Sequence, residues 1–259
     1  MSDVRLEIRD HIALLTLARP DKLNALTHAM GSAIQDAVAQ LNAEAAVRVV
    51  LVRGEGRSFS AGGDLDFLRD NAQRSPEDNT RGMRAFYEKF LSVRQLKVPS
   101  IAVVHGRATG AGLMFALGCD LRVASEEAIV AANFVRVGLN PGMGGTYLLE
   151  RLVGPGPAAE LVYTGRDVLM GEALAIGLVN HVVQAEHLEE TAWKLAESIA
   201  QNAPVAVRRT KAILAHQAGS LTEALDLEAA GQAECFASED LLEGIRAIQE
   251  RRRPQFSGH

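Results

Sequence analysis

Ser58-Phe-Ser-Ala-Gly-Gly-Asp-Leu65 and Gly106-Arg-Ala-Thr-Gly-Ala-Gly-Leu113 are the two stretches that decide the fold. The first follows the apolar run Val49–Val52. The second lies between the apolar run Ile101–Val104 and a helical pattern at Leu113–Leu117. Short continuous apolar runs are typical of parallel strands that are buried on both faces. Two strand-to-helix turns of this kind indicate an α/β fold with a parallel sheet.

The segments around these turns continue the alternation of strands and helices. An alternating pattern over residues 4–8 precedes the apolar run 12–17, which predicts two paired strands that turn at Arg9-Asp10. Further elements are expected in chain order: a helix capped by Thr27 with apolar positions Met30, Ile34, Val38 and Leu41, a helix over Met83–Leu96 after the polar segment Asn71–Thr80, and strands at Leu121–Ala124 and Gly177–Val183.

From Leu188 onward the sequence has only helical patterns. Ser220 and Glu223 have the spacing of a capping box, which predicts that a helix begins there. The last helix carries an apolar stripe that either packs on the chain's own core or completes an oligomer interface: Leu241, Leu242, Ile245 and Ile248. We expect a core with the active site over residues 1–200 and a C-terminal helical oligomerisation module over residues 201–259.

The composition excludes several functional classes. It is 47% apolar and 23% charged, which is typical of a globular protein. A net charge of −5, with Arg251–Arg253 as its basic cluster, argues against nucleic-acid binding. No apolar signal core or run of ~20 apolar residues is present, so we expect a cytoplasmic protein without membrane association. Cys119 and Cys235 lack metal-ligand spacing, so we expect no metal site.

The two turns share a physical design. Their small residues let a ligand approach the backbone, and unpaired N–H groups at a helix entrance favour an anion or a developing oxyanion. Two such N–H groups that converge on one oxygen would form an oxyanion hole. The alternative is two tight turns that need glycine for geometry alone. A Rossmann-type nucleotide enzyme is disfavoured because no Gly-x-Gly-x-x-Gly follows the first strand.

Several motifs that occur in order resemble the crotonase (enoyl-CoA hydratase/isomerase) superfamily: Pro20-Asp-Lys-Leu-Asn-Ala-Leu26, Phe59-Ser-Ala-Gly-Gly-Asp64, Ala108-Thr-Gly-Ala-Gly112, Cys119-Asp120, Pro141-Gly-Met-Gly-Gly-Thr146 and the closing segment Ser238 to Phe256. The resemblance spans nearly the whole chain. It implies a crotonase-like spiral of repeated strand–strand–helix units with a C-terminal helical module. It also implies an acyl-CoA thioester as the substrate, no cofactor beyond that coenzyme A, and assembly as a trimer or a dimer of trimers.

The resemblance also assigns roles to residues. The backbone N–H groups of Ala61 and Ala111 would hold the thioester oxygen. Asp64 is expected to cap its own loop, because this aspartate recurs in the family whatever the chemistry. The residues implied to lie along coenzyme A and the acyl group are Lys22, Leu23, Ala25, Gly62, Gly63, Asp64, Leu65, Gly110, Met114, Phe134, Leu139, Pro141 and Gly142.

The sequence departs from the family at its acidic positions. Hydratases of the family carry two glutamates, which are replaced here by Met114 and Phe134. Around Leu139–Leu149 the chain looks closest to the ring-opening isomerases of phenylacetate catabolism, whose acid is replaced by Gly142. A positioned acid or base contributes roughly 10²–10⁴-fold in rate. We therefore expect isomerase-type or related proton-transfer chemistry rather than efficient hydration. The alternative is a non-catalytic acyl-CoA carrier.

Other polar residues are weaker candidates for the missing acid or base. His105 is expected to be a buried, hydrogen-bonded structural histidine rather than a base. Arg136 could hold an acyl carboxylate or could lie in solvent. The remaining polar candidates are Tyr87, Glu88, Asn140 and Tyr147.

Overall fold

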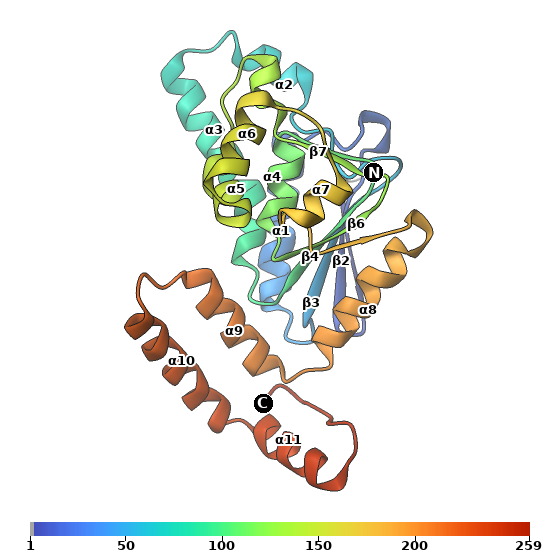
Figure 1. Ribbon diagram of the computed structural model, residues 1–259, viewed down its shortest axis with the longest axis vertical. Coiled ribbons are helices and arrows are strands. Elements are labelled where there is room, and N and C mark those ends of the chain that lie inside the picture. The colour runs from blue at the N-terminus through green and yellow to red at the C-terminus, as the bar shows by residue number, and fades with distance from the viewer. Residues whose placement is uncertain (1–2) are drawn as a thin grey trace.

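The computed structural model describes residues 3–259, and Figure 1 shows a twisted sheet covered by helices, with three helices projecting below it. Within these residues the larger sheet has six strands in the order β1-β2-β3-β4-β6-β9. Their bounds are β1 (Val4–Arg9), β2 (Ile12–Leu17), β3 (Val49–Gly54), β4 (Ser100–Val104), β6 (Leu121–Ser125) and β9 (His181–Val183). β1 and β2 are antiparallel and every later neighbour is parallel, which confirms the predicted α/β fold.

Alternate residues of this sheet pack into two different layers. Leu15, Val50 and Val52 belong to the larger core, which also contains the buried faces of α1 (His28–Ala43), α3 (Pro76–Leu91) and α4 (Ala111–Gly118). Leu14, Leu51 and Ile101 face α8 (Leu188–Ala200) on the other side. The expected cap of α1 is confirmed, because the Thr27 hydroxyl accepts the Met30 N–H at 3.2 Å.

A second, smaller sheet is absent from the sequence-based predictions. It has three strands in the order β5-β7-β8: β5 (Arg107–Thr109), β7 (Ile129–Ala131) and β8 (Val168–Leu169). Strands of two or three residues are too short to give an alternating pattern. β5 lies inside the second glycine-rich turn, so this sheet fixes the backbone that leads into α4.

α3 and the last strand differ most from the predicted bounds, and α3 ends at Leu91 rather than at Leu96. α3 begins at Pro76 rather than at Met83, because the Ser75 hydroxyl accepts the Asp78 N–H and Pro76 occupies the first turn. The polar segment before Met83 is therefore the exposed start of the helix. The last strand covers His181–Val183, and the residues before it from Gly177 form a turn.

The remaining helices complete the body and the C-terminal module. The body also contains α2 (Leu65–Asn71), α5 (Gly145–Val153), α6 (Pro155–Thr164) and α7 (Met170–Ala175), with 3-10 turns at Pro20–Lys22, Ser92–Gln95, Asn133–Val137 and Ala185–His187. The module consists of α9 (Pro204–His216), α10 (Leu221–Phe236) and α11 (Glu239–Glu250) (Figure 1). The Ser220 hydroxyl accepts the Glu223 N–H, which confirms the predicted start of α10.

The module is tied to the body through one buried side chain. Lys211 of α9 donates to the Asp120 carboxylate and to the Val98 carbonyl, both at 2.8 Å. Asp120 also accepts the Ser100 N–H at 2.7 Å. None of the helices formed by residues 3–259 has the length and apolar character that a membrane crossing needs.

Candidate active site

The two glycine-rich turns lie against each other. The Ser60 N–H donates to the Arg107 carbonyl, and the Thr109 N–H donates to the Ser60 carbonyl, both at 3.0 Å. The Thr109 hydroxyl adds a 2.9 Å bond to the Ala61 carbonyl. Segments almost fifty residues apart in sequence are therefore held as one backbone unit at the entrance to α4.

Glycine is required where the two turns meet. Gly62 has a φ of +94°, a conformation that residues with a Cβ rarely adopt. A Cβ at this position would lie 2.6 Å from the Thr109 carbonyl oxygen and 3.4 Å from the Ala111 nitrogen. The bare Gly62 backbone thus brings the first turn close to the Ala111 N–H.

Two backbone N–H groups at this junction are unpaired within residues 3–259. Ala111 is the first residue of α4, so its N–H has no intrahelical partner. Neither the Ala111 N–H nor the Gly63 N–H donates a hydrogen bond within that range. The Ala61 N–H, in contrast, donates to the Leu23 carbonyl at 2.9 Å. The Ala61 N–H is therefore already bonded within the chain, which differs from the expectation from sequence. The N–H groups of Gly63 and Ala111 remain free to bind a ligand.

The segment before α1 braces the first turn. The Leu26 N–H donates to the Gly62 carbonyl at 2.7 Å, and the Asp64 N–H donates to the Leu26 carbonyl at 3.2 Å. The side chain of the buried Asn24 donates to the Ser58 carbonyl at 2.8 Å. Gly63 is thus held between two hydrogen bonds that its neighbours make to Leu26. Of the expected coenzyme A contacts on this segment, Lys22 is exposed, whereas Leu23 and Ala25 are half-buried.

Asp64 has the structural role expected from the sequence. Its carboxylate accepts the Asp66 N–H at 3.0 Å and so caps α2. It also lies 3.3 Å from the Arg19 guanidinium. A carboxylate that is bound on both sides in this way positions its loop rather than the substrate. Leu65, the next residue, is exposed.

Comparisons with known proteins show the family to which the chain belongs. A family model described as enoyl-CoA hydratase/isomerase matches residues 7–259. The chain belongs to the enoyl-CoA hydratase/isomerase family. It is 37% identical to the crotonyl-CoA hydratase of Syntrophomonas wolfei and 36% identical to the short-chain-enoyl-CoA hydratase of Clostridium acetobutylicum. Both matches cover 98% of this chain and 97% of the relative.

Solved structures of the family have the same fold. A putative enoyl-CoA hydratase from Streptomyces coelicolor matches with a TM-score of 0.94 at 38% identity, over 99% of this chain and 94% of that chain. The enoyl-CoA hydratase from Bacillus anthracis matches with a TM-score of 0.93 at 35% identity, over 99% and 100% of the two chains. The predicted crotonase-like fold is confirmed, and the chain is an enzyme of this family.

Apolar side chains occupy the two positions at which the resemblance implies hydratase glutamates. Met114 is fully buried one turn after Ala111, and its sulfur would lie 2.8 Å from a Cβ at Gly145. Phe134 is half-buried and packs against the larger core. Met143 is also fully buried, and Leu139 is exposed. The interpretation of Met114 as a packing residue agrees with this burial.

Tyr87 lies against the bare backbone of Gly142. A Cβ at Gly142 would lie 2.6 Å from the Tyr87 hydroxyl oxygen, so the phenol fills the space that a side chain at this position would need. Burial raises the pKa of the Tyr87 phenol above its ordinary value. The hydroxyl therefore stays protonated at neutral pH.

The other polar candidates are engaged elsewhere or exposed. His105 bonds the Gly56 carbonyl at 2.9 Å, which confirms the predicted hydrogen bond, but its side chain is half-buried rather than buried. Arg136 is exposed. Glu88 bonds to Arg84 and Asn140 to the Pro141 carbonyl, both close by in the chain. Tyr147 donates to Gln217 at the end of α9.

His28 is a polar residue near the site that the sequence analysis did not single out. It is the first residue of α1, two residues after Leu26, and its ring packs edge-on against Phe67 and Phe86. Burial lowers the pKa of His28, and the positive charge of Lys89 adds to this. The only sequence signal would have been a histidine at a helix start, which occurs at many positions.

The thiols and carboxylates do not form a metal site. Within residues 3–259 no group of three or more His, Cys, Asp or Glu side chains could hold a metal ion. Cys119 is buried, and burial raises the pKa of its thiol to about 12. It is therefore an inert packing residue.

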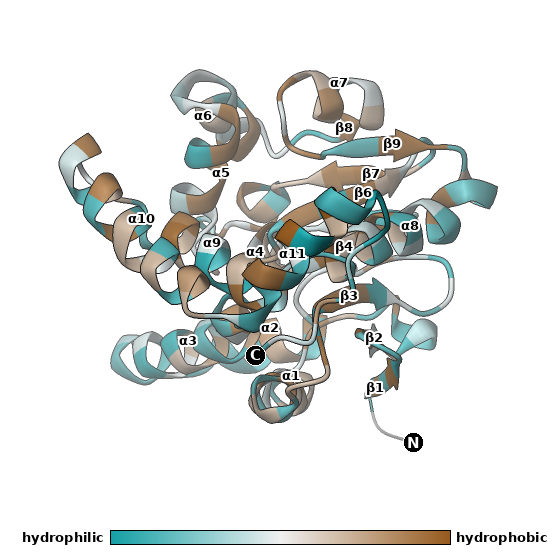
Figure 2. Ribbon diagram, turned by 90° about the horizontal axis from the view of Figure 1, so that it is seen from below, coloured by the Kyte–Doolittle hydropathy of each residue, from teal (hydrophilic) through white to brown (hydrophobic). Residues whose placement is uncertain are grey.

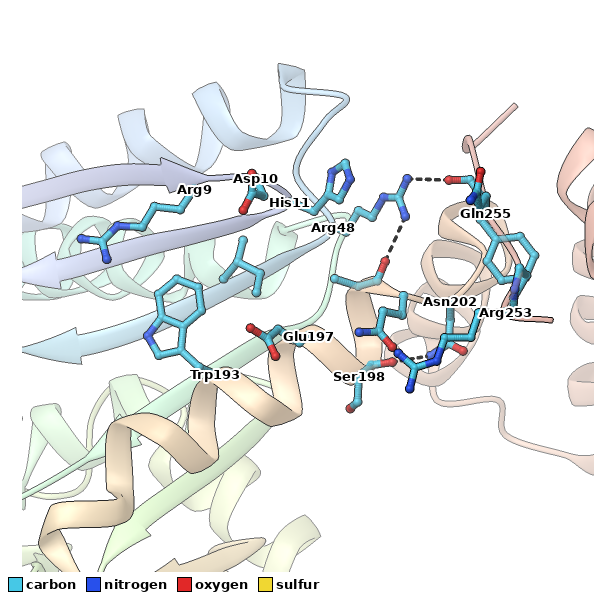
Figure 3. Close-up of a pocket in the computed structure, with 15 residues that line it drawn as sticks. Arg9, Asp10, His11, Arg48, Trp193, Glu197, Ser198, Asn202, Arg253 and Gln255 are labelled. Carbon is cyan, nitrogen blue, oxygen red and sulfur yellow. Dashed lines mark hydrogen bonds between the residues drawn. The ribbon is translucent and has the colours of Figure 1, made fainter.

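A groove of about 590 Å³ lies away from the two turns, between the β1–β2 turn, α8 and the C-terminal tail (Figure 3). Arg48 crosses its inner end and donates to the Ala200 and Phe256 carbonyls at 3.0 and 2.8 Å. Trp193 lines the other end, beneath Arg9. The Arg48 guanidinium thus holds the C-terminal tail to the body of the protein.

Proposed function

We propose that this enzyme binds an acyl-CoA thioester with the carbonyl oxygen between the N–H groups of Gly63 and Ala111. The observation that carries the proposal is the pair of unpaired donors on two turns that are bonded to each other. Gly63 takes the place that we expected for Ala61, because the Ala61 N–H already donates to Leu23. Gly62 allows the close approach of the two turns.

The proposed chemistry is stabilisation of a thioester enolate. Water or a group of the substrate takes a proton from the carbon next to the thioester carbonyl, and negative charge develops on the carbonyl oxygen. Two preorganised donors hold that charge without rearrangement. Ala111 also begins α4, whose N-terminus carries partial positive charge. Fixed donors of this kind favour the charged intermediate more than the neutral substrate.

Isomerase-type or related proton-transfer chemistry fits the site better than efficient hydration. Hydration needs a group that activates water, and both positions implied for that role carry apolar side chains, Met114 and Phe134. The names of the relatives favour hydration, so the two lines of argument differ. Met114 and Phe134 cannot supply the positioned base that water activation needs, whereas α-proton transfer can use water or a group of the substrate as the proton acceptor.

The exposed edge of the first turn is proposed to receive coenzyme A. Lys22 is exposed and supplies positive charge for a phosphate, and Leu23 and Ala25 lie next to it. Leu65 projects from the start of α2 with 70% of its surface exposed, so it can cover an adenine ring. No cofactor beyond the coenzyme A of the substrate is proposed.

Ala111→Pro tests the proposal by deleting one donor. Proline lacks an N–H but is tolerated at the first position of a helix, where that N–H is unpaired. Exchange of the α-protons of butanoyl-CoA with D₂O reports enolate formation whatever the natural product is. We expect the exchange rate to fall ~10²–10³-fold. The dissociation constant for butanoyl-CoA should rise only about 2- to 12-fold, because a neutral hydrogen bond contributes about 0.5–1.5 kcal/mol.

Leu221→Pro is the matched control, since it places proline at the first position of α10, far along the chain from the two turns. Circular dichroism of both variants checks that they fold. Binding of butanoyl-CoA without exchange in the wild-type protein would contradict the proposed enolate chemistry. If folded Ala111→Pro exchanges α-protons as fast as the wild type, then Ala111 is not a donor to the thioester oxygen.

A further inference from the structure

The environment of Tyr87 differs from that of every other candidate near the two turns. Its ring packs on the larger core beside Phe86, while its hydroxyl donates to nothing within residues 3–259. The only fully buried polar side-chain atom without a partner in this range is the Asn79 carbonyl oxygen. The Tyr87 hydroxyl therefore keeps an accessible surface on which a ligand could bond.

Contacts place this hydroxyl beside the acyl side of the proposed site. Tyr87 and Leu91 lie one turn apart on α3, and they face Gly142 and Gly144 respectively. The same loop reaches Met114 through Gly145. Met114 in turn lies one helical turn after Ala111, the proposed donor to the thioester oxygen.

Several apolar residues lie on the elements that flank Tyr87. Phe86 precedes Tyr87 in α3 and is buried. Met143 in the facing loop and Met114 in α4 are also buried. Gly142 offers no side chain, and the side chain of Glu88 points to Arg84. An accessible hydroxyl in an apolar wall can fix the orientation of a ligand that offers it an acceptor, and it disfavours one that leaves it unpaired.

We infer that Tyr87 is a specificity-determining residue that donates a hydrogen bond to an oxygen on the acyl group, beyond the thioester carbonyl. The ligand class is therefore an acyl-CoA with a hydroxyl or carbonyl oxygen on its acyl chain or ring. This inference rests on the proposed acyl-CoA site. Since burial raises the pKa of the phenol, Tyr87 acts as a neutral donor rather than as a base.

The test compares four-carbon ligands that differ only in oxygen: butanoyl-CoA, the two enantiomers of 3-hydroxybutanoyl-CoA, and 4-hydroxybutanoyl-CoA. Calorimetry gives their dissociation constants for the wild-type protein and for Tyr87→Phe, which keeps the ring and removes the hydroxyl. We expect the wild type to bind at least one hydroxyacyl ligand more tightly than butanoyl-CoA. Tyr87→Phe should raise the dissociation constant of that ligand about 3- to 10-fold and change that of butanoyl-CoA by less than about twofold.

Tyr163→Phe is the matched control, because Tyr163 is 78% exposed on α6 and should change no affinity. The inference is overturned if no hydroxyacyl ligand is preferred, or if the preference survives in Tyr87→Phe. In either case butanoyl-CoA would still bind the wild type, so the proposed function would stand. If no acyl-CoA binds the wild-type protein, the proposed function and this inference fail together.

Discussion

Ala61 and Gly63 are two residues apart in the first turn, and of these two only the Gly63 N–H is without a partner within residues 3–259. The small residues of both turns predict that backbone N–H groups gather at this point, and the structure agrees. The Leu23 carbonyl decides which N–H stays unpaired, because it accepts a hydrogen bond from the Ala61 N–H. Leu23 lies 38 residues before Ala61 in the chain. No local pattern encodes that pairing. The apolar character of positions 114 and 134, by contrast, could be stated from the sequence alone.

Hydration of a four-carbon 2-enoyl-CoA should be slow in this enzyme. Met114 and Phe134 cannot activate water, and a missing acid or base costs roughly 10²–10⁴-fold. The expected turnover at saturating substrate is well below the usual enzymatic median of ~10 s⁻¹. The loss of enoyl absorbance measures this rate. A rate at or above that median would mean that another side chain activates the water.

Gly62→Ala should damage both stability and catalysis. The φ of +94° is strained for alanine, and its Cβ would meet the Thr109 carbonyl at 2.6 Å. We expect the free energy of unfolding to fall by about 1–3 kcal/mol and α-proton exchange to fall with it. Gly171→Ala in α7 is the control, because a Cβ there meets nothing within 4 Å. Equal stability of the two variants in urea would contradict the role of Gly62.

At the scale of elements, the sequence predicts long, strongly patterned segments and misses short ones. The buried strands and the capped helix α1 carry continuous apolar or helical patterns, and they appear where expected. The start of α3 is misplaced because its first turns are polar and exposed, and polar residues there resemble a loop. β5, β7 and β8 are held by pairing between distant segments, which no local pattern reveals.

The start of α1 should make stability depend on pH through His28. Burial lowers its pKa in the folded protein, so the folded state favours the neutral ring. Its contribution to stability is therefore complete above the unfolded pKa of ~6.5 and is lost as the pH falls below that value. A charged ring at a helix N-terminus adds to the effect.

We expect His28→Leu to lose less stability than the wild type between pH 7.5 and pH 5.5. Urea unfolding of both proteins at the two pH values measures this difference. The same pH dependence in the two proteins would show that His28 protonates equally well in the folded and unfolded states.

At the scale of the whole molecule, apolar side chains remain uncovered on the C-terminal module. Leu242 and Ile248 of α11 are 61% and 80% exposed, and Phe236 of α10 is 71% exposed. Figure 2 shows hydrophobic residues along α10 and α11. Exposed apolar patches of this kind mark interaction surfaces. Three residues of the stripe predicted from sequence, Leu242, Ile245 and Ile248, are thus exposed, whereas Leu241 is half-buried.

We predict a homo-oligomer, as a trimer or a dimer of trimers, with the C-terminal module in the interface. Light scattering should give three or six times the chain mass of 27.8 kDa. Leu242→Glu with Ile248→Glu should lower that mass, whereas Gln249→Glu on the same helix should not. Point substitutions are sharper than truncation before Ser238, which would also remove the Phe256 carbonyl that binds Arg48. A monomer mass for the intact chain would contradict the prediction.

The position of the thioester oxygen is the central claim, and a crystal structure with bound butanoyl-CoA measures it directly. The account predicts that this oxygen lies about 2.7–3.2 Å from the nitrogens of both Gly63 and Ala111. It also predicts that the Ala61 N–H keeps its bond to the Leu23 carbonyl. A thioester oxygen bound by the Ala61 N–H, or one that contacts neither Gly63 nor Ala111, would contradict the account.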